Sequence, residues 1–193
     1  VSACLVGSEL CIGDSLWGRP ALVTAFLGAA DRFRAAYPDQ PLARGDLDAP
    51  GPRHSTHDRG VDVDLYLLGA MRVENAGGGR YPNNYEDLDP AEIEEKRARV
   101  LELAKAFADC SRGHLRIYYN DEVVVERFLA WYGEQGFEGS PFETPMRTHN
   151  ALHEFHFHIS IADDLEPWPV PELPDGAGHP VEPIREPPAP ETA

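Results

Sequence analysis

Histidine is concentrated in two short clusters of this 193-residue chain. Six of its eight histidines fall in them: His54, His57, His149, His153, His156 and His158. Imidazole nitrogens bind zinc and also exchange protons near neutral pH. The clusters therefore predict a metal site, a proton-transfer site, or both together. The alternative is a set of solvated surface histidines.

The first cluster leads into an expected strand that carries two aspartates. Apolar and polar residues alternate from position 61 onward, which is typical of a half-buried strand. Gly60 permits a sharp turn between the loop and this strand. His57 on the loop and Asp64 on the strand could then converge on one ion. We expect Asp62 to be a turn residue or an acceptor that holds a ligand imidazole, rather than a ligand itself.

The second cluster lies on an expected strand of residues 155–161. Side chains two residues apart share one face of a strand, about 7 Å from each other, so His156 and His158 should lie side by side. Packing alone gives no reason for this pairing, which makes sense if one ring binds a metal and the other handles a proton. His57, Asp64 and His158 would supply three ligands, and three protein ligands with an open fourth position are typical of catalytic zinc.

These two patterns together resemble a known family. The motifs H-x-x-H-x-x-G-x-D-x-D and H-x-x-H-x-H resemble those of penicillin-insensitive murein endopeptidases, in the group that includes lysostaphin-type peptidases, D-Ala-D-Ala metallopeptidases and hedgehog domains. The similarity extends over about residues 20–162. Family members use one catalytic zinc ion to cut peptidoglycan cross-links between D-alanine and meso-diaminopimelate. The resemblance implies that His57, Asp64 and His158 bind zinc, that His156 is the general base, and that His153 stabilises the oxyanion.

The spacing also separates branches of that group. D-Ala-D-Ala peptidases carry a glutamate base where this chain has Phe155, and lysostaphin-type enzymes place three residues, not six, between the first histidine and the aspartate. Some relatives hold a second metal through the histidine equivalent to His54. No histidine lies between His57 and His114, so the sequence does not support a second ion, and His54 is expected to orient the ligands.

The three cysteines leave two interpretations open. Val1-Ser2-Ala3-Cys4 looks like the end of a bacterial lipoprotein signal, in which Cys4 would be lipidated. Cys11 and Cys110 would then remain for one disulfide, which an exported protein could form. Otherwise Cys4 pairs with Cys11, or all three are thiols.

The intervening elements predict an α+β fold. Helices are expected over 20–37, from an N-cap at Asp89 to about 108, and over 121–134. Strands are expected over 41–45, 61–68, 115–119 and 155–161. Together they predict a small, mainly antiparallel central sheet with flanking helices, and the resemblance implies a hedgehog/DD-peptidase-like arrangement. We expect an N-terminal leader or tether over 1–18, a zinc peptidase domain over 19–164 and a proline-rich, disordered tail over 165–193.

Charge and hydropathy narrow the classes of partner. A formal net charge of −16 argues against binding to nucleic acid or to an anionic bilayer. No apolar run approaches the ~20 residues of a transmembrane span, so the only expected membrane attachment is the lipid at Cys4. The resemblance implies peptidoglycan cross-link peptides as substrate, in the periplasm or outer envelope of a bacterium. The alternatives are a non-catalytic, zinc-containing hedgehog-like binding module and an envelope-anchored structural protein.

Overall fold

The computed structural model describes residues 3–4, 18–40, 42–44, 59–66, 89–138, 140–150, 153 and 156–167. Their elements, in chain order, are β1 (Ala3–Cys4), α1 (Pro20–Ala36), β2 (Ala43–Arg44), β3 (Asp62–Tyr66), α2 (Pro90–Cys110), β4 (Leu115–Tyr118), α3 (Glu122–Glu134), β5 (Met146–Arg147) and β6 (His156–Ile161). The predicted α+β class is confirmed, with three helices and a small sheet. None of the helices within these residues is long and apolar enough to cross a membrane.

Strand β3, which carries Asp62 and Asp64, and strand β6, which carries His156 and His158, lie at the centre of the sheet. Its order is β1-β2-β3-β6-β4-β5, and every neighbouring pair is antiparallel except β4 and β5. The register sets Asp64 of β3 opposite His158 of β6, with Tyr118 of β4 on the other side of His158. Residues far apart in the chain therefore lie abreast on three adjacent strands.

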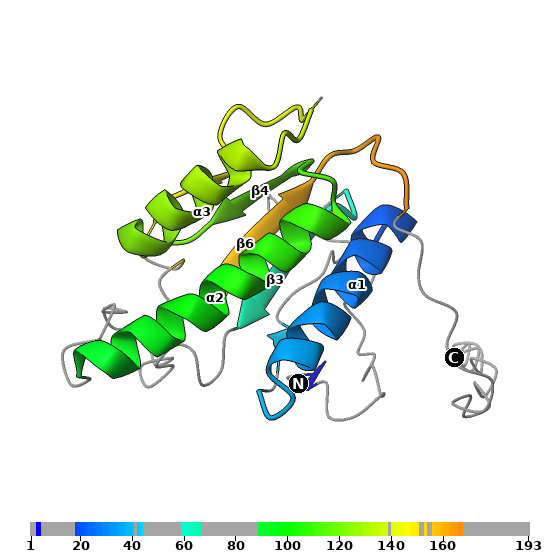
Figure 1. Cartoon of the computed structure of the whole chain (residues 1–193). Helices are drawn as coiled ribbons and strands as arrows, with labels where there is room; N and C mark the ends of the chain where they lie inside the picture. The colour runs from blue at the N-terminus through cyan, green and yellow to red at the C-terminus, as the bar shows by residue number, and fades with distance from the viewer. Residues whose placement is uncertain are drawn as a thin grey trace, which may run out of the picture.

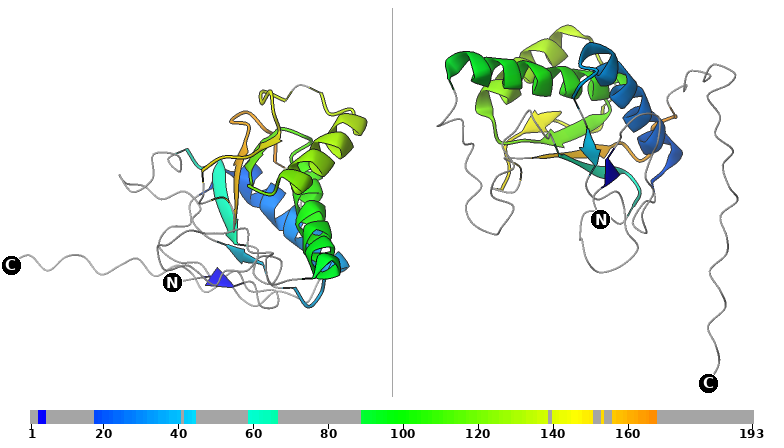
Figure 2. Two further views of the ribbon diagram at one scale, coloured as in Figure 1. Left: turned by 90° about the vertical axis from the view of Figure 1, so that its left-hand side faces the viewer. Right: turned by 90° about the horizontal axis from the view of Figure 1, so that it is seen from below.

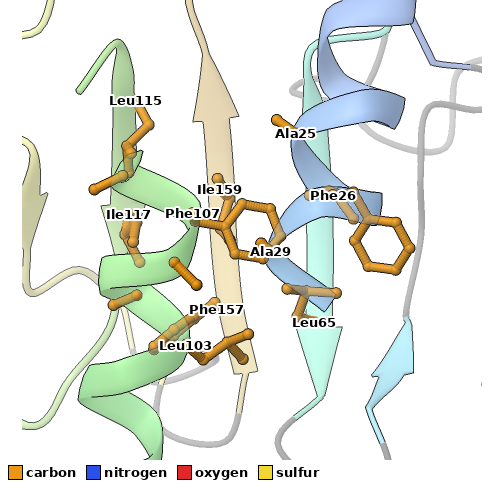
Figure 3. Close-up of a cluster of buried hydrophobic side chains, with 14 of the residues drawn as sticks. Ala25, Phe26, Ala29, Leu65, Leu103, Phe107, Leu115, Ile117, Phe157 and Ile159 are labelled. Carbon is orange, nitrogen blue, oxygen red and sulfur yellow. The ribbon is translucent and has the colours of Figure 1, made fainter. Parts of the chain in front are cut away.

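The three helices cover one face of this sheet. Figure 1 shows α1 and α2 side by side in front of β3 and β6, and Figure 2 shows all three helices on the same side of the strands. Helix α1 contributes Phe26 to the core and α2 contributes Phe107, whose ring centroids lie 6.3 Å apart. In Figure 3 the strand side chains that meet these helices come from β3, β4 and β6: Leu65, Leu115, Ile117, Phe157 and Ile159.

Local signals in the sequence explain where the helices start. Asp89 and Glu92 form a capping box at the first turn of α2. Asp121 caps α3 by accepting hydrogen bonds from the first-turn amides, and also pairs with Arg97 of α2 at 2.9 Å. Pro20 occupies the first turn of α1, where its missing N–H costs nothing. The three helices begin and end within about two residues of the predicted bounds.

Alternation along the strands leaves the second face of the sheet polar. Val63 and Leu65 of β3 and Phe157 and Ile159 of β6 belong to the core, so the residues between them point to the opposite face. Those residues are Asp62, Asp64, His156, His158 and Ser160. The predicted sharing of one face by His156 and His158 agrees with this alternation. Strand β3 begins shortly after Gly60, whose φ of 73° is one that glycine adopts without strain.

Candidate functional site

The centre of the polar face is an aspartate–histidine pair. Oδ1 of Asp64 lies 3.0 Å from Nδ1 of His158, and the two residues face each other across β3 and β6. The His158 ring is buried, with 7% of the residue exposed. An aspartate oxygen and an imidazole nitrogen from neighbouring strands are thus held within hydrogen-bond distance.

A second aspartate contacts the other nitrogen of the same ring. Asp62 Oδ1 lies 3.3 Å from Nε2 of His158 and accepts a hydrogen bond from the Ser160 hydroxyl. Asp62 is buried, and its Oδ2 has no hydrogen-bond partner among the described residues. His158 therefore lies between two carboxylates, one at each ring nitrogen.

This arrangement favours the charged form of His158. Burial alone would disfavour the imidazolium, but hydrogen bonds to Asp62 and Asp64 and their negative charges outweigh it and raise the pKa of His158 from 6.5 to about 9. In the metal-free protein at neutral pH, both ring nitrogens therefore carry protons and donate to the two aspartates.

Two further histidines adjoin the pair. Nε2 of His156 lies 3.7 Å from Asp64 Oδ1, and the His153 ring centroid lies 5.1 Å from that of His156. Nδ1 of His153 faces both the backbone oxygen (3.3 Å) and Oδ1 (2.9 Å) of Asn150. A backbone oxygen only accepts, so Nδ1 carries the proton and Nε2 presents a lone pair. Burial, reinforced by the nearby His156, lowers the pKa of His153 from 6.5 to about 4.

Tyr118, His149 and Arg147 adjoin these residues, and of the three only His149 stood out in the sequence, as a member of the second histidine cluster. The Tyr118 ring stacks on His149 at a centroid distance of 4.4 Å and lies 5.4 Å from His153 and 5.7 Å from His158. Arg147 donates a hydrogen bond to the Tyr118 hydroxyl at 2.9 Å. The sequence signal for Tyr118 was its alternation with buried Leu115, Ile117 and Tyr119 on a strand that also carries polar residues.

The donors present are compatible with part of a zinc site. Neighbouring donors on tetrahedral zinc lie roughly 3.3 Å apart, close to the separation of Asp64 Oδ1 and His158 Nδ1. A metal at Nδ1 would take the place of a proton and leave Asp62 on Nε2–H, which is how carboxylates orient zinc-bound histidines. No group of three His, Cys, Asp or Glu side chains within the described ranges could hold a metal unaided. At least one more ligand is therefore needed.

Several predicted site residues lie outside the described part of the chain. His57, the expected third ligand, is among them, as are His54 and Cys11. Cys4 lies in β1, where only its backbone is described. Cys110 is buried and forms no disulfide with a described residue, and burial raises the pKa of its thiol to about 11, so the thiol is unsuited to nucleophilic catalysis. The Cys11–Cys110 disulfide and the lipidation of Cys4 remain predictions.

Comparison of the chain with protein-family models, with curated proteins and with solved structures finds no match. Its activity must therefore be inferred from its own residues.

Proposed function

We propose that the protein is a zinc-dependent murein endopeptidase that hydrolyses D-alanyl-meso-diaminopimelyl cross-links of peptidoglycan, on a hedgehog/DD-peptidase-like fold. The observation that carries the proposal is the contact of Asp64 Oδ1 with His158 Nδ1, with Asp62 at the opposite nitrogen and two more histidines alongside. A purely structural role gives no reason for gathering three imidazoles and two carboxylates on one buried patch.

Asp64 and His158 would hold the zinc ion together with His57. When bound, the ion supplies a Lewis acid for the scissile carbonyl and for a water molecule. Asp62 fixes the His158 ring with Nδ1 toward Asp64, so that this nitrogen is directed at the same point as the carboxylate.

Proton transfer is assigned to the other two histidines. His156 borders Asp64 and would accept the proton of the attacking water and return it to the leaving amine. His153 is neutral at pH 7 in the metal-free protein, because its pKa is about 4. It would stabilise a developing oxyanion only after gaining a proton, and Nε2 is the nitrogen free to receive it.

A murein endopeptidase works where peptidoglycan lies, in the periplasm or at the outer envelope of a bacterium, and lipidation of Cys4 would tether it there. The segment before α1 would then act as the tether, and the peptidase domain would extend from about residue 19 to 164.

A set of three histidine variants tests the proposal. His158→Ala should lose both stoichiometric zinc and cleavage of muropeptide dimers. His156→Ala should keep zinc while turnover falls by roughly 10²–10⁴, the usual contribution of a positioned general base. His114→Ala is the matched control, because His114 contacts the backbone oxygen of Glu138 away from this cluster, and it should retain both properties.

The readouts are elemental analysis for zinc and mass spectrometry for released monomers. Loss of zinc in His156→Ala would make His156 a ligand instead of the base. Full activity in His156→Ala would refute the peptidase mechanism. Stoichiometric zinc in a wild-type protein that cleaves no dimer would favour the non-catalytic hedgehog-like module instead.

A further inference from the structure

Two arginines lie beside the histidine–aspartate cluster. Arg116 of β4 is the partner of Ser160 in the sheet register, and Arg147 of β5 is the partner of Tyr118. Their Cζ atoms lie 4.9 and 5.1 Å from the centroid of the Tyr118 ring. That ring is 5.7 Å from the ring of His158. Both arginines and the proposed metal ligand thus adjoin the same aromatic ring.

Neither arginine has a carboxylate within ion-pair distance among the described residues. This is unusual in a chain with 33 acidic and 17 basic residues. Apart from Arg112, every other arginine whose side chain is described contacts an acidic residue: Arg19, Arg32, Arg34, Arg59, Arg97, Arg99 and Arg127. The two positive charges at the site are therefore left available for an external anion.

Both guanidinium groups are held in place by aromatic contacts. Arg116 lies over the rings of Tyr118 and Phe142, at 4.9 and 5.2 Å, and its buried Nε has no hydrogen-bond partner among the described residues. Arg147 is positioned by its hydrogen bond to the Tyr118 hydroxyl. Because a planar guanidinium presents its N–H groups as a fork that matches a carboxylate, such fixed groups favour binding of that anion.

We infer that Arg116 and Arg147 form a carboxylate-binding subsite that recognises a free carboxylate of the peptide substrate next to the scissile amide. The inference rests on the proposed function, in which the scissile nitrogen belongs to meso-diaminopimelate and the free carboxylate is on the carbon that bears this nitrogen. It also explains how a chain of net charge −16 engages an anionic polymer, since positive charge is concentrated where the substrate carboxylate would lie.

The first test measures binding without turnover. The probes are the tripeptide L-alanyl-D-glutamyl-meso-diaminopimelate, a product stem, and the same tripeptide amidated at the carboxyl group beside the acceptor amine. Isothermal titration of the full-length protein should show at least ~10-fold tighter binding of the acid than of the amide, as expected for a charge-assisted hydrogen-bonded pair.

The variants Arg147→Gln and Arg116→Gln should lower this acid-to-amide ratio to about 1–2. Arg147→Lys keeps the charge but not the fork, so its ratio should fall between those of wild type and Arg147→Gln. Arg112→Gln is the control, because Arg112 also has no acidic partner among the described residues but lies in the turn after α2, and it should keep the wild-type ratio. Arg147 is exposed, so its variants should fold, which circular dichroism checks.

Equal binding of acid and amide by wild type, no binding of either, or an unchanged ratio in Arg147→Gln would overturn the subsite. Cleavage of cross-linked dimers, assayed separately, keeps this outcome distinct from failure of the proposed function. Cleavage of acid and amidated dimers at equal kcat/KM would sustain the endopeptidase and refute the subsite. A preference for the acid tripeptide in a protein that cleaves no dimer would sustain the subsite and refute the endopeptidase.

Discussion

The metal-free protein should lose stability as the pH rises from 6.5 to 9, because of His158. Its pKa is about 9 in the folded state and 6.5 as the ordinary value, so the native state binds more protons than the unfolded state over this interval. The stabilisation is fully present below pH 6.5 and is lost as the pH rises through 9. At 1.36 kcal/mol for each pKa unit, the full shift contributes about 3 kcal/mol to the free energy of unfolding, and most of this contribution is lost between pH 6.5 and 9.

Asp62→Asn is the perturbation that isolates this effect. Asparagine keeps an oxygen that can accept from the Ser160 hydroxyl, but it removes one of the two negative charges at His158. The pKa of His158 should fall, and the loss of stability over this pH interval should shrink. Asp109→Asn is the control, because it removes one carboxylate charge from an exposed ion pair with Arg32 that does not involve His158.

Urea denaturation in the presence of a chelator, at several pH values from 6.5 to 9, measures the slope of the free energy of unfolding against pH. This pH interval excludes the effects of two other groups on the free energy of unfolding. His153, with a pKa of about 4, changes it below pH 6.5, and Cys110, with a pKa of about 11, changes it above pH 9. Only the change with pH is compared, so a constant loss of stability in the variant cancels. Identical slopes in wild type and Asp62→Asn would refute the assigned role of the two carboxylates.

The cap of α3, the zinc ligand His158 and the C-terminal segment can each be tested separately. Asp121→Ala removes the cap of α3 and the buried carboxylate that pairs with Arg97, so chemical denaturation should show a loss of about 2–4 kcal/mol in the free energy of unfolding. Asp109→Ala at the surface should lose less than about 1 kcal/mol, and equal losses in the two variants would contradict the buried role of Asp121. Zinc binding at pH 7.5 should release about one proton from His158, which calorimetry in buffers of different ionisation enthalpy measures; no release would contradict ligation through Nδ1. The predicted tail begins at residue 165, but Leu165 packs against the core, so the deletion tested is 168–193. It should leave cleavage in solution unchanged, because a proline-rich segment buries too little to shape a site; a folded but inactive truncation would contradict the predicted tail.

The elements that the sequence predicted well are those with a local signal. The 3.6-residue period, the capping residues and the alternation of β6 suffice for the helices and for the shared face of His156 and His158. Strands β1 and β5 were not predicted, because each has only two residues. Two residues are too few to show a period, and such strands form only by pairing with another part of the chain. The place of Tyr118 beside His158 depends on the strand order, which local patterns do not encode.

Local sequence patterns also gave no sign of the role that we propose for the two arginines. Arg116 and Arg147 are unremarkable in the sequence, and their significance comes from their missing carboxylate partners among the described residues and from the ring that they share. The protonation states of the histidines also could not be predicted from the sequence. The pKa of His158 is raised and that of His153 lowered because the first ring lies between two carboxylates and the second among other imidazoles.

The most direct test of the central claim is mass analysis of purified, cross-linked muropeptide dimers after incubation with the full-length protein, with and without a chelator. We predict conversion of dimers to monomers at the D-alanyl-meso-diaminopimelyl bond, loss of that conversion with the chelator, and its recovery when one equivalent of zinc is restored. Dimers that stay intact with zinc-loaded protein, or cleavage that persists at full rate in the chelator, would contradict it.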